Sequence, residues 1–150
     1  SHPAHHSQLP GCCALGCDQV IKNIRMLRLI LLVGTGGFLG TVSRFLMSRY
    51  VTANYASSFP FGTFAVNILG CLLIGIIYGI AEKGDFISSE WRLFLTVGFC
   101  GGFTTFSAFA AENMAMLRDS EFFHFFLYTG SSIFVGLLAT FAGIMITKIL

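Results

Sequence analysis

The sequence predicts an all-α integral membrane protein with four transmembrane helices, the third of them broken near its centre. Three observations lead to this fold class. The chain of 150 residues is 55% hydrophobic and 11% charged, with a mean hydropathy of +0.77, whereas soluble domains carry about 25% charged residues. Four apolar runs each exceed the about 20 residues that span a hydrocarbon core. The third run also holds three glycines within five residues, at Gly98, Gly101 and Gly102.

The four helices are expected at residues 27–50, 61–81, 91–117 and 122–149. The connectors between them are short and hold most of the acidic residues, so residues 26–150 form one four-helix transmembrane domain. Residues 1–25 are polar and differ in kind from the rest, and a natural start at Met26 would directly precede the first apolar run. We interpret residues 1–25 as an N-terminal extension that is either disordered or not native.

The first helix carries Gly36 and Gly40 at the spacing that lets helices approach closely, and Gly75 and Gly79 repeat this spacing in the second helix. We interpret both pairs as packing faces. Arg44 lies near the end of the first helix. It either extends to the lipid headgroups or attracts anions to an aqueous vestibule at a pore mouth.

Basic residues leave the orientation of the chain open. From Met26 on, the side that holds both termini and the opposite side carry similar numbers of Lys and Arg, namely Arg28, Lys83, Arg92 and Lys148 against Arg44, Arg49 and Arg118. Because positive charge sets orientation, such a chain could insert both ways and form an antiparallel pair. Lys22 and Arg25 in the extension would bias the termini inward.

The second helix has one polar, small face, because Thr63, Asn67 and Gly70 recur at helical spacing. An asparagine buried in a membrane must find hydrogen-bond partners. Asn67 therefore either joins helices or lines a pore.

The glycine-rich stretch of the third run predicts the break. If the helix opens around Gly101, Gly102 and Thr104, carbonyl oxygens are freed within the membrane, which is tolerable only against protein, a cavity or an ion. Freed carbonyls favour a hard cation. The alternative is an unbroken helix whose glycines serve packing.

Beyond the predicted break, Phe106 and Phe109 share one helical face with Ser107 between them. In the unbroken alternative these rings belong to the core. Glu112 follows one turn later, and the cost of a carboxylate in lipid places it near the interface or a water-filled vestibule. In the fourth helix Tyr128 and Ser132 share a face, with hydroxyls that bond either their own backbone or a partner.

This inventory favours passive conduction over catalysis. It contains neutral amide and hydroxyl groups and aromatic ring edges mid-span, but no nucleophile paired with a base and no phosphate-binding loop, so we expect no enzymatic activity. The net charge of +2 is small and scattered, which does not favour a nucleic-acid partner. Neutral donors and positive ring edges replace part of the hydration shell of an anion without holding it too tightly.

Three motifs resemble those of the Fluc-type (CrcB) fluoride ion channel family. They are GTGGFLGTVSRF at Gly34–Phe45, FPFGTFAVNILGCLLIG at Phe59–Gly75, and GFCGGFTTFSAF at Gly98–Phe109, which is followed by Glu112. They occur in the order that the family has them, and the resemblance covers nearly all of Met26–Leu150. It identifies fluoride as the ion, which the residues alone do not select.

The resemblance implies a fluoride-selective passive channel in the plasma (inner) membrane that exports fluoride from the cytoplasm and lowers its toxicity. It also implies a dual-topology, antiparallel homodimer with a structural sodium ion, which is not transported. In this chain the carbonyls of Gly101 and Thr104 match the sodium ligands.

The resemblance further implies a set of pore residues. The matching positions are Asn67, Thr105, Phe106, Ser107, Phe109, Tyr128 and Ser132 in the pore, with Arg44 and Glu112 in the vestibule. The family usually shows TTFSTFS, whereas this chain has Ala108 and Ala110. Fluoride is still expected to pass, with Ser107, Asn67 and Ser132 as donors.

Two rival functions remain. A small dual-topology four-helix multidrug or cation antiporter would need a membrane-embedded carboxylate, typically in the first helix, but residues 27–50 hold no Asp or Glu. A non-transporting assembly subunit would tolerate other apolar residues at positions 67, 106 and 109.

Overall fold

The computed structural model describes residues 12–55, 57, 59–84 and 87–149, with side chains described from residue 18 onward. This part of the chain is helical and contains no strand. Four stretches are long and apolar enough to cross a membrane, namely Asp18–Asn54, Phe61–Glu82, Ser89–Arg118 and Phe122–Ile149. The predicted all-α fold class with four membrane spans is therefore confirmed. The chain divides into two compact units, Ser1–Leu31 and Leu32–Leu150.

The first helix, α1, covers Cys12–Asn54 and so begins well before the predicted residue 27. Residues 17–33 contain neither glycine nor proline, so nothing interrupts the helix there. Within the first unit, Lys22 pairs with Asp18 one turn earlier at 2.8 Å. Residues 12–25 thus belong to the helix, while residues 1–11 of the expected extension lie outside the described residues. The domain boundary at residue 26 stays a prediction.

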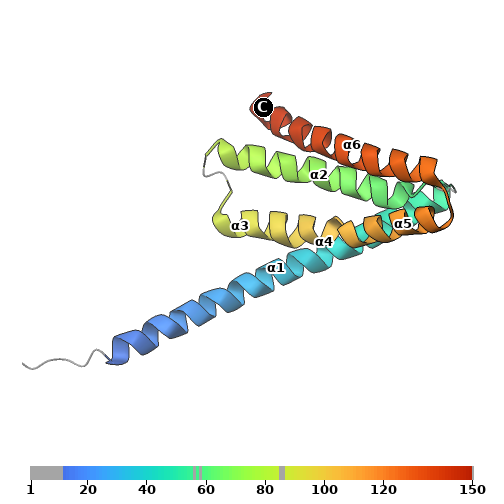
Figure 1. Ribbon diagram of the computed structural model, residues 1–150. Coiled ribbons are helices and arrows are strands. Elements are labelled where there is room, and N and C mark those ends of the chain that lie inside the picture. Colours follow the sequence, from blue (N-terminus) through green and yellow to red (C-terminus); the bar gives the residue numbers. More distant parts are fainter. Residues whose placement is uncertain (1–11, 56, 58, 85–86, 150) are drawn as a thin grey trace, which may run out of the picture. The chain divides into compact units, whose positions relative to one another are not determined.

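In the second unit, α2 (Phe61–Glu82) runs alongside α6 (Phe122–Ile149), as Figure 1 shows. The two backbones approach closely at glycines. A Cβ atom on Gly143 would lie 2.5 Å from the Leu72 carbonyl oxygen, and one on Gly75 would overlap the Thr140 carbonyl oxygen. Gly75 therefore serves as the packing residue that its spacing predicts.

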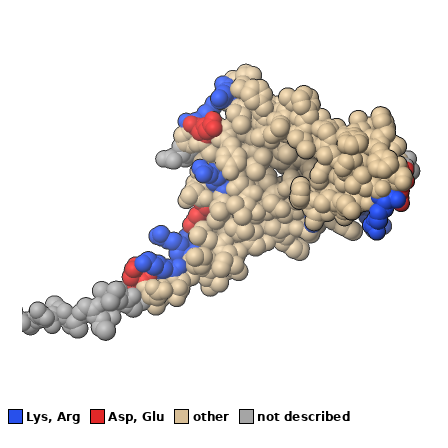
Figure 2. Space-filling model, in the orientation of Figure 1, with Lys and Arg blue, Asp and Glu red and all other residues tan. Residues whose placement is uncertain are grey.

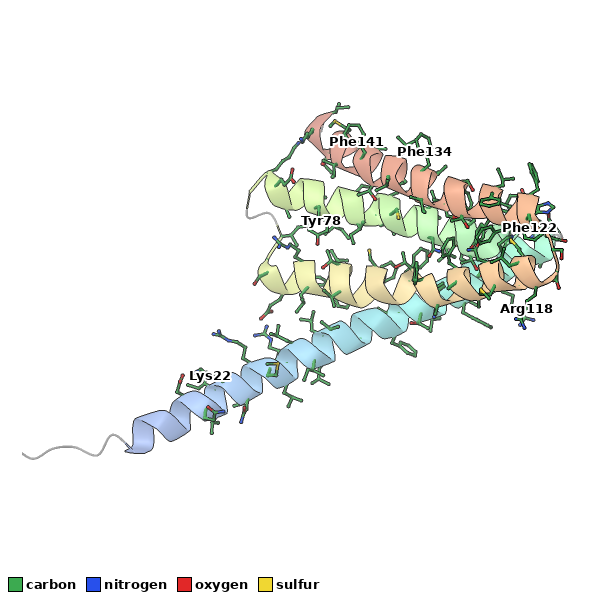
Figure 3. All side chains as sticks on the ribbon, in the orientation of Figure 1. Lys22, Tyr78, Arg118, Phe122, Phe134 and Phe141 are labelled. Atoms are coloured by element: carbon green, nitrogen blue, oxygen red, sulfur yellow. The ribbon has the colours of Figure 1, made fainter. Side chains whose placement is uncertain are left out.

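The surface of this unit suits a lipid environment. On the face seen in Figure 2, charged side chains gather at the two ends of the helices and leave the middle uncharged. Phe134 and Phe141, on α6, point away from α2 (Figure 3) and are 66% and 57% exposed. Large exposed aromatic side chains at mid-helix are stable only against lipid or another protein.

The third span consists of four helical pieces. It begins with α3 (Ser89–Leu93), continues as the π-helical η1 (Phe94–Cys100) and α4 (Gly101–Phe103), and resumes as α5 (Phe106–Arg118). Between α4 and α5 the backbone is extended, with φ and ψ of −79° and 155° at Thr104 and −146° and 115° at Thr105. The predicted break near the centre of the third helix is confirmed.

The position of the break differs from the one that the glycines suggest. Gly101 and Gly102 are helical, and the chain opens only at the two threonines that follow. Gly102 instead permits close packing with α1, because a Cβ atom there would lie 2.5 Å from the Gly37 carbonyl oxygen. Gly40 packs in the same way, since a Cβ atom on it would overlap the Phe99 carbonyl oxygen. These close approaches at Gly37, Gly40 and Gly102 pack α1 against the third span beside the break.

Candidate ion pathway

Asn67 on α2 stabilises the extended backbone at the break in the third span. The Thr105 amide N–H donates to Asn67 Oδ1 at 2.9 Å, and Asn67 Nδ2 donates to the Thr105 carbonyl oxygen at 3.3 Å. One side-chain amide thus satisfies both backbone groups of an extended residue. Thr105 also caps α5, because its Oγ1 accepts from the Ala108 amide at 3.4 Å, the bond expected of a threonine at a helix N-terminus.

These bonds divert the usual helical partners of two carbonyl groups. In an unbroken α-helix the amide of residue i+4 donates to the carbonyl of residue i. Here the Thr105 amide, which would serve Gly101, donates to Asn67, and the Ala108 amide, which would serve Thr104, donates to the Thr105 side chain. The carbonyl oxygens of Gly101 and Thr104 therefore lose their helical donors. Within the described ranges, no cluster of three His, Cys, Asp or Glu residues offers a metal site of another kind.

An inner cavity of about 330 Å³ lies beside the break. Its lining is Asn67, Gly70, Cys71, Ile74, Thr104, Thr105, Phe106, Phe109, Ser132 and Ile133. Five of the seven predicted pore residues thus meet in one place. The rings of Phe106 and Phe109 lie 5.8 Å apart between centroids. Ser132 Oγ is buried and has no hydrogen-bond partner among the described residues, which is unusual for a buried hydroxyl.

Glu112 is held by two hydroxyl groups from neighbouring helices. Thr63 Oγ1 donates to Glu112 Oε1 at 2.5 Å, and Tyr128 OH donates to Oε2 at 2.7 Å. Tyr128 is fully buried, and its ring centroid lies 5.1 Å from that of Phe109. Tyr128 therefore supports the wall of the inner cavity and the Glu112 carboxylate, but it does not line the cavity.

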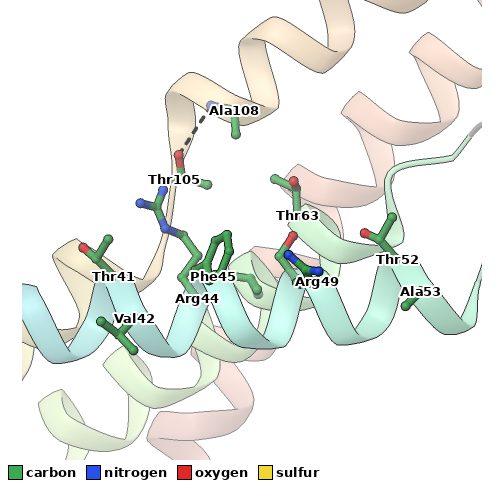
Figure 4. A pocket seen from close by; sticks show the side chains of 12 residues that line it. Thr41, Val42, Arg44, Phe45, Arg49, Thr52, Ala53, Thr63, Thr105 and Ala108 are labelled. Atoms are coloured by element: carbon green, nitrogen blue, oxygen red, sulfur yellow. Dashed lines mark hydrogen bonds between the residues drawn. The ribbon is translucent and has the colours of Figure 1, made fainter.

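A larger outer cavity of about 840 Å³ lies between α1, α2 and the start of α5 (Figure 4). Its lining is Thr41, Val42, Arg44, Phe45, Ser48, Arg49, Thr52, Ala53, Thr63, Val66, Thr105 and Ala108. Arg44 thus lines this cavity, while its role in an aqueous vestibule stays a prediction. Thr105 lines both cavities, so both border the break in the third span.

The structure places Ser107 outside both cavities and gives Thr63 a partner that the sequence does not predict. Ser107 is exposed, lines neither cavity and has its hydroxyl 3.3 Å from that of Thr105. The sequence places Thr63 on a polar helix face but does not predict its pairing with Glu112. Periodicity within α2 indicates that Thr63 faces inward without indicating what it faces, and the two residues lie 49 positions apart. Arg49, five residues after Arg44, is a further cavity residue that the motifs do not indicate.

Known proteins resemble this chain over most of its length. A family model described as "CrcB-like protein, Camphor Resistance (CrcB)" matches residues 31–144. Three similar proteins carry the name "Fluoride-specific ion channel FluC". The one from Flavobacterium psychrophilum is 42% identical over 122 residues, covering 81% of this chain and 98% of the relative. The one from Chlorobium luteolum is 48% identical over 119 residues, covering 79% and 92%. The one from Chlorobaculum tepidum is 45% identical over 130 residues, covering 87% and 98%.

Proposed function

The chain belongs to the CrcB-like protein family, and from this premise we propose that it is a fluoride-selective passive ion channel. It conducts fluoride out of the cytoplasm across the plasma membrane and so lowers fluoride toxicity. The named relatives supply the identity of the ion. The two cavities that border Thr105 support a path for it across the chain.

The observation that carries the proposal is the buried Ser132 hydroxyl, which has no partner among the described residues and lines the inner cavity with Asn67. An unsatisfied buried hydroxyl costs about 1–3 kcal/mol. A small anion in the cavity would remove this cost by accepting a hydrogen bond from the hydroxyl group. Asn67 contributes as well, because its Nδ2 carries two N–H donors and only one is used by the Thr105 carbonyl.

The pore walls favour fluoride passage over tight binding. Ser132 and Asn67 offer neutral donors, and Phe106 and Phe109 offer ring edges, which carry the positive part of the aromatic quadrupole. No Lys or Arg lines the inner cavity, so the ion meets no full positive charge there. Conduction requires binding strong enough for the ion to enter and weak enough for it to leave.

The carbonyl oxygens of Gly101 and Thr104, which lack their helical donors, suit a structural sodium ion. Gly101 and Thr104 each present a carbonyl oxygen without its helical donor, and carbonyl oxygens are ligands that hard cations prefer. When bound, sodium would supply positive charge that stabilises these two oxygens at the break. Gly101 is exposed on this chain, which supports a second copy that contributes the same pair of ligands.

The second copy is an antiparallel partner in a dual-topology homodimer. Phe106 is 79% exposed although it lines the inner cavity, so one wall of that cavity is open on a single chain. A partner packed on this side would enclose the pathway, which a selective pore requires. From Met26 on, the nearly balanced basic residues of the two membrane sides support insertion in both orientations, whereas Lys22 and Arg25 favour termini inside.

Fluoride efflux from proteoliposomes tests the proposal. The purified chain should release fluoride down its gradient far faster than chloride, with no requirement for a proton gradient. Ser132→Ala should slow fluoride efflux, whereas Ser131→Ala, which removes a hydroxyl that donates to the Tyr128 carbonyl, should leave it near wild type. Efflux driven by a proton gradient and carrying organic cations would instead support the antiporter. Absence of any flux would refute a channel.

A further inference from the structure

The outer cavity contains a second cationic side chain that the pathway described above does not use. Arg49 lines this cavity together with Arg44, and both belong to α1. Five residues separate them along the helix, which corresponds to about 7.5 Å along its axis. Figure 4 shows Arg44 reaching toward Thr105 at the break, whereas Arg49 lies further along α1, toward Thr52. The two guanidinium groups therefore stand at different depths.

Neither positive charge is neutralised by a neighbouring carboxylate. Throughout the described segments, no ion pair involves Arg44 or Arg49. Among the described residues, no Asp or Glu lines the outer cavity, and its remaining polar side chains are five hydroxyls, from Thr41, Ser48, Thr52, Thr63 and Thr105. The Glu112 carboxylate lies next to Thr63, whose hydroxyl donates to it, and is not itself part of the lining. A hollow lined by charges of one sign and by apolar walls concentrates ions of the opposite sign.

We infer that Arg49 is an outer capture site for small monovalent anions, which raises the local fluoride concentration before the ion reaches Arg44 and the break. The inference rests on the proposed channel function and assigns to it a residue that controls access rate. Arg49 is exposed whereas Arg44 is half-buried. An anion that arrives from water would therefore meet Arg49 first and Arg44 second. Arg49 does not touch the ion in the inner cavity, so its removal should leave selectivity intact.

The ionic-strength dependence of fluoride efflux tests this inference. Arg49→Gln removes the charge and keeps a polar side chain. At low ionic strength it should lower the initial efflux rate by about three- to tenfold, at the lower end of electrostatic steering effects. Raising the ionic strength to 1 M with an impermeant salt should abolish the difference, because the screening length falls to about 3 Å. Arg49→Lys should restore most of the rate.

Arg118 provides a matched control. It lies in the last turn of α5, outside both cavities and labelled in Figure 3, so Arg118→Gln changes the net charge equally without changing the cavity. Its efflux should match wild type at both ionic strengths. An equal loss in Arg118→Gln would mean that net charge matters and not Arg49, and this would overturn the inference.

A lipid contact or a structural role of Arg49 would give different results. If Arg49 only contacts lipid phosphates, Arg49→Gln will lower thermal stability in vesicles of phosphatidylglycerol and leave the salt dependence of efflux unchanged, which would overturn the inference. An equal reduction at low and high salt would indicate a structural defect and would also overturn it. If the wild-type chain releases fluoride and Arg49→Gln releases it at the same rate, the capture site is refuted and the channel is not. A wild-type chain that passes no fluoride refutes both this inference and the channel.

Discussion

Replacing Asn67 should destabilise the protein more than replacing any other polar side chain of α2, because Asn67 is the partner of both backbone groups of Thr105. Asn67→Ala leaves an N–H and a carbonyl unsatisfied beside an apolar cavity. Each buried unsatisfied group costs about 1–3 kcal/mol. The bond at 3.3 Å is the weaker of the two, so the expected loss in the free energy of unfolding is about 2–4 kcal/mol.

Asn67→Leu separates the loss of hydrogen bonds from the loss of side-chain volume, and Asn113→Ala serves as a control at another site. Asn67→Leu refills the space but offers neither donor nor acceptor, so it should be about as destabilised as Asn67→Ala. Asn113→Ala is the matched asparagine change away from the break. Its side chain donates to the Phe109 carbonyl within its own helix at 2.8 Å and accepts from Thr129 at 2.8 Å, and such interhelical bonds are worth about 0.6–1.7 kcal/mol.

The assay is reversible unfolding in lipid bicelles, combined with hydrogen exchange of the segment 101–107. In both Asn67 variants the Thr105 amide should exchange faster, while amides of α6 keep their wild-type protection. If Asn67→Leu proves as stable as wild type, or if Asn113→Ala loses more than Asn67→Ala, the assignment of Asn67 as the residue that holds the break is wrong.

Contacts in the second unit support three further predictions. Gly102→Ala should cost about 1–3 kcal/mol of unfolding free energy, because its methyl would lie 2.5 Å from the Gly37 carbonyl oxygen and the two helices must separate. Glu112→Gln should lower the free energy of unfolding by about 1–3 kcal/mol, because charge-assisted bonds such as the one from Tyr128 become neutral. Ala110→Ser adds one donor and should speed fluoride efflux by no more than about fivefold, the equivalent of one neutral hydrogen bond.

Each of these has a clear contrary result. A Cβ atom on Gly34 would meet no heavy atom of the described residues within 4 Å, so Gly34→Ala should stabilise the helix by up to about 1 kcal/mol, and equal losses at both glycines would contradict the packing argument. Unchanged unfolding in Glu112→Gln would show that the carboxylate is not stabilising. Efflux that is absent in wild type and restored by Ala110→Ser would show that Ser107, Asn67 and Ser132 do not suffice as donors.

Sequence reasoning predicts the elements of this fold better than their contacts. Hydropathy and length are local properties, so the predicted ends of α2 and α6 agree with the structure within a residue. The break is predicted around Gly101, Gly102 and Thr104, and the structure opens at Thr104 and Thr105 while both glycines stay helical. Glycine permits both an open backbone and a close approach, and only the position of Gly37 on a neighbouring helix decides that Gly102 serves the second purpose.

In the candidate site, too, the sequence predicts features of single helices better than contacts between helices. Helical spacing correctly predicts that Tyr128 and Ser132 share a face. It does not predict that Tyr128 donates to Glu112, or that the Ser132 hydroxyl has no hydrogen-bond partner among the described residues. The sequence leaves Asn67 between two roles, joining helices and lining a pore; the structure shows it joining α2 to the third span and lining the inner cavity, while the pore role stays a prediction. Such outcomes depend on how helices are rotated against one another, which no single helix encodes.

The interruption at Thr104 and Thr105 also has an electrostatic consequence. The peptide dipoles of the segment up to Phe103 end there with their negative pole, and those of α5 begin there with their positive pole. Two extended residues therefore bring opposite partial charges close together at membrane depth, using the backbone alone. A single discontinuity of this kind favours a cation on one side and an anion on the other, and it does so without the desolvation cost of placing an ionised side chain in the bilayer.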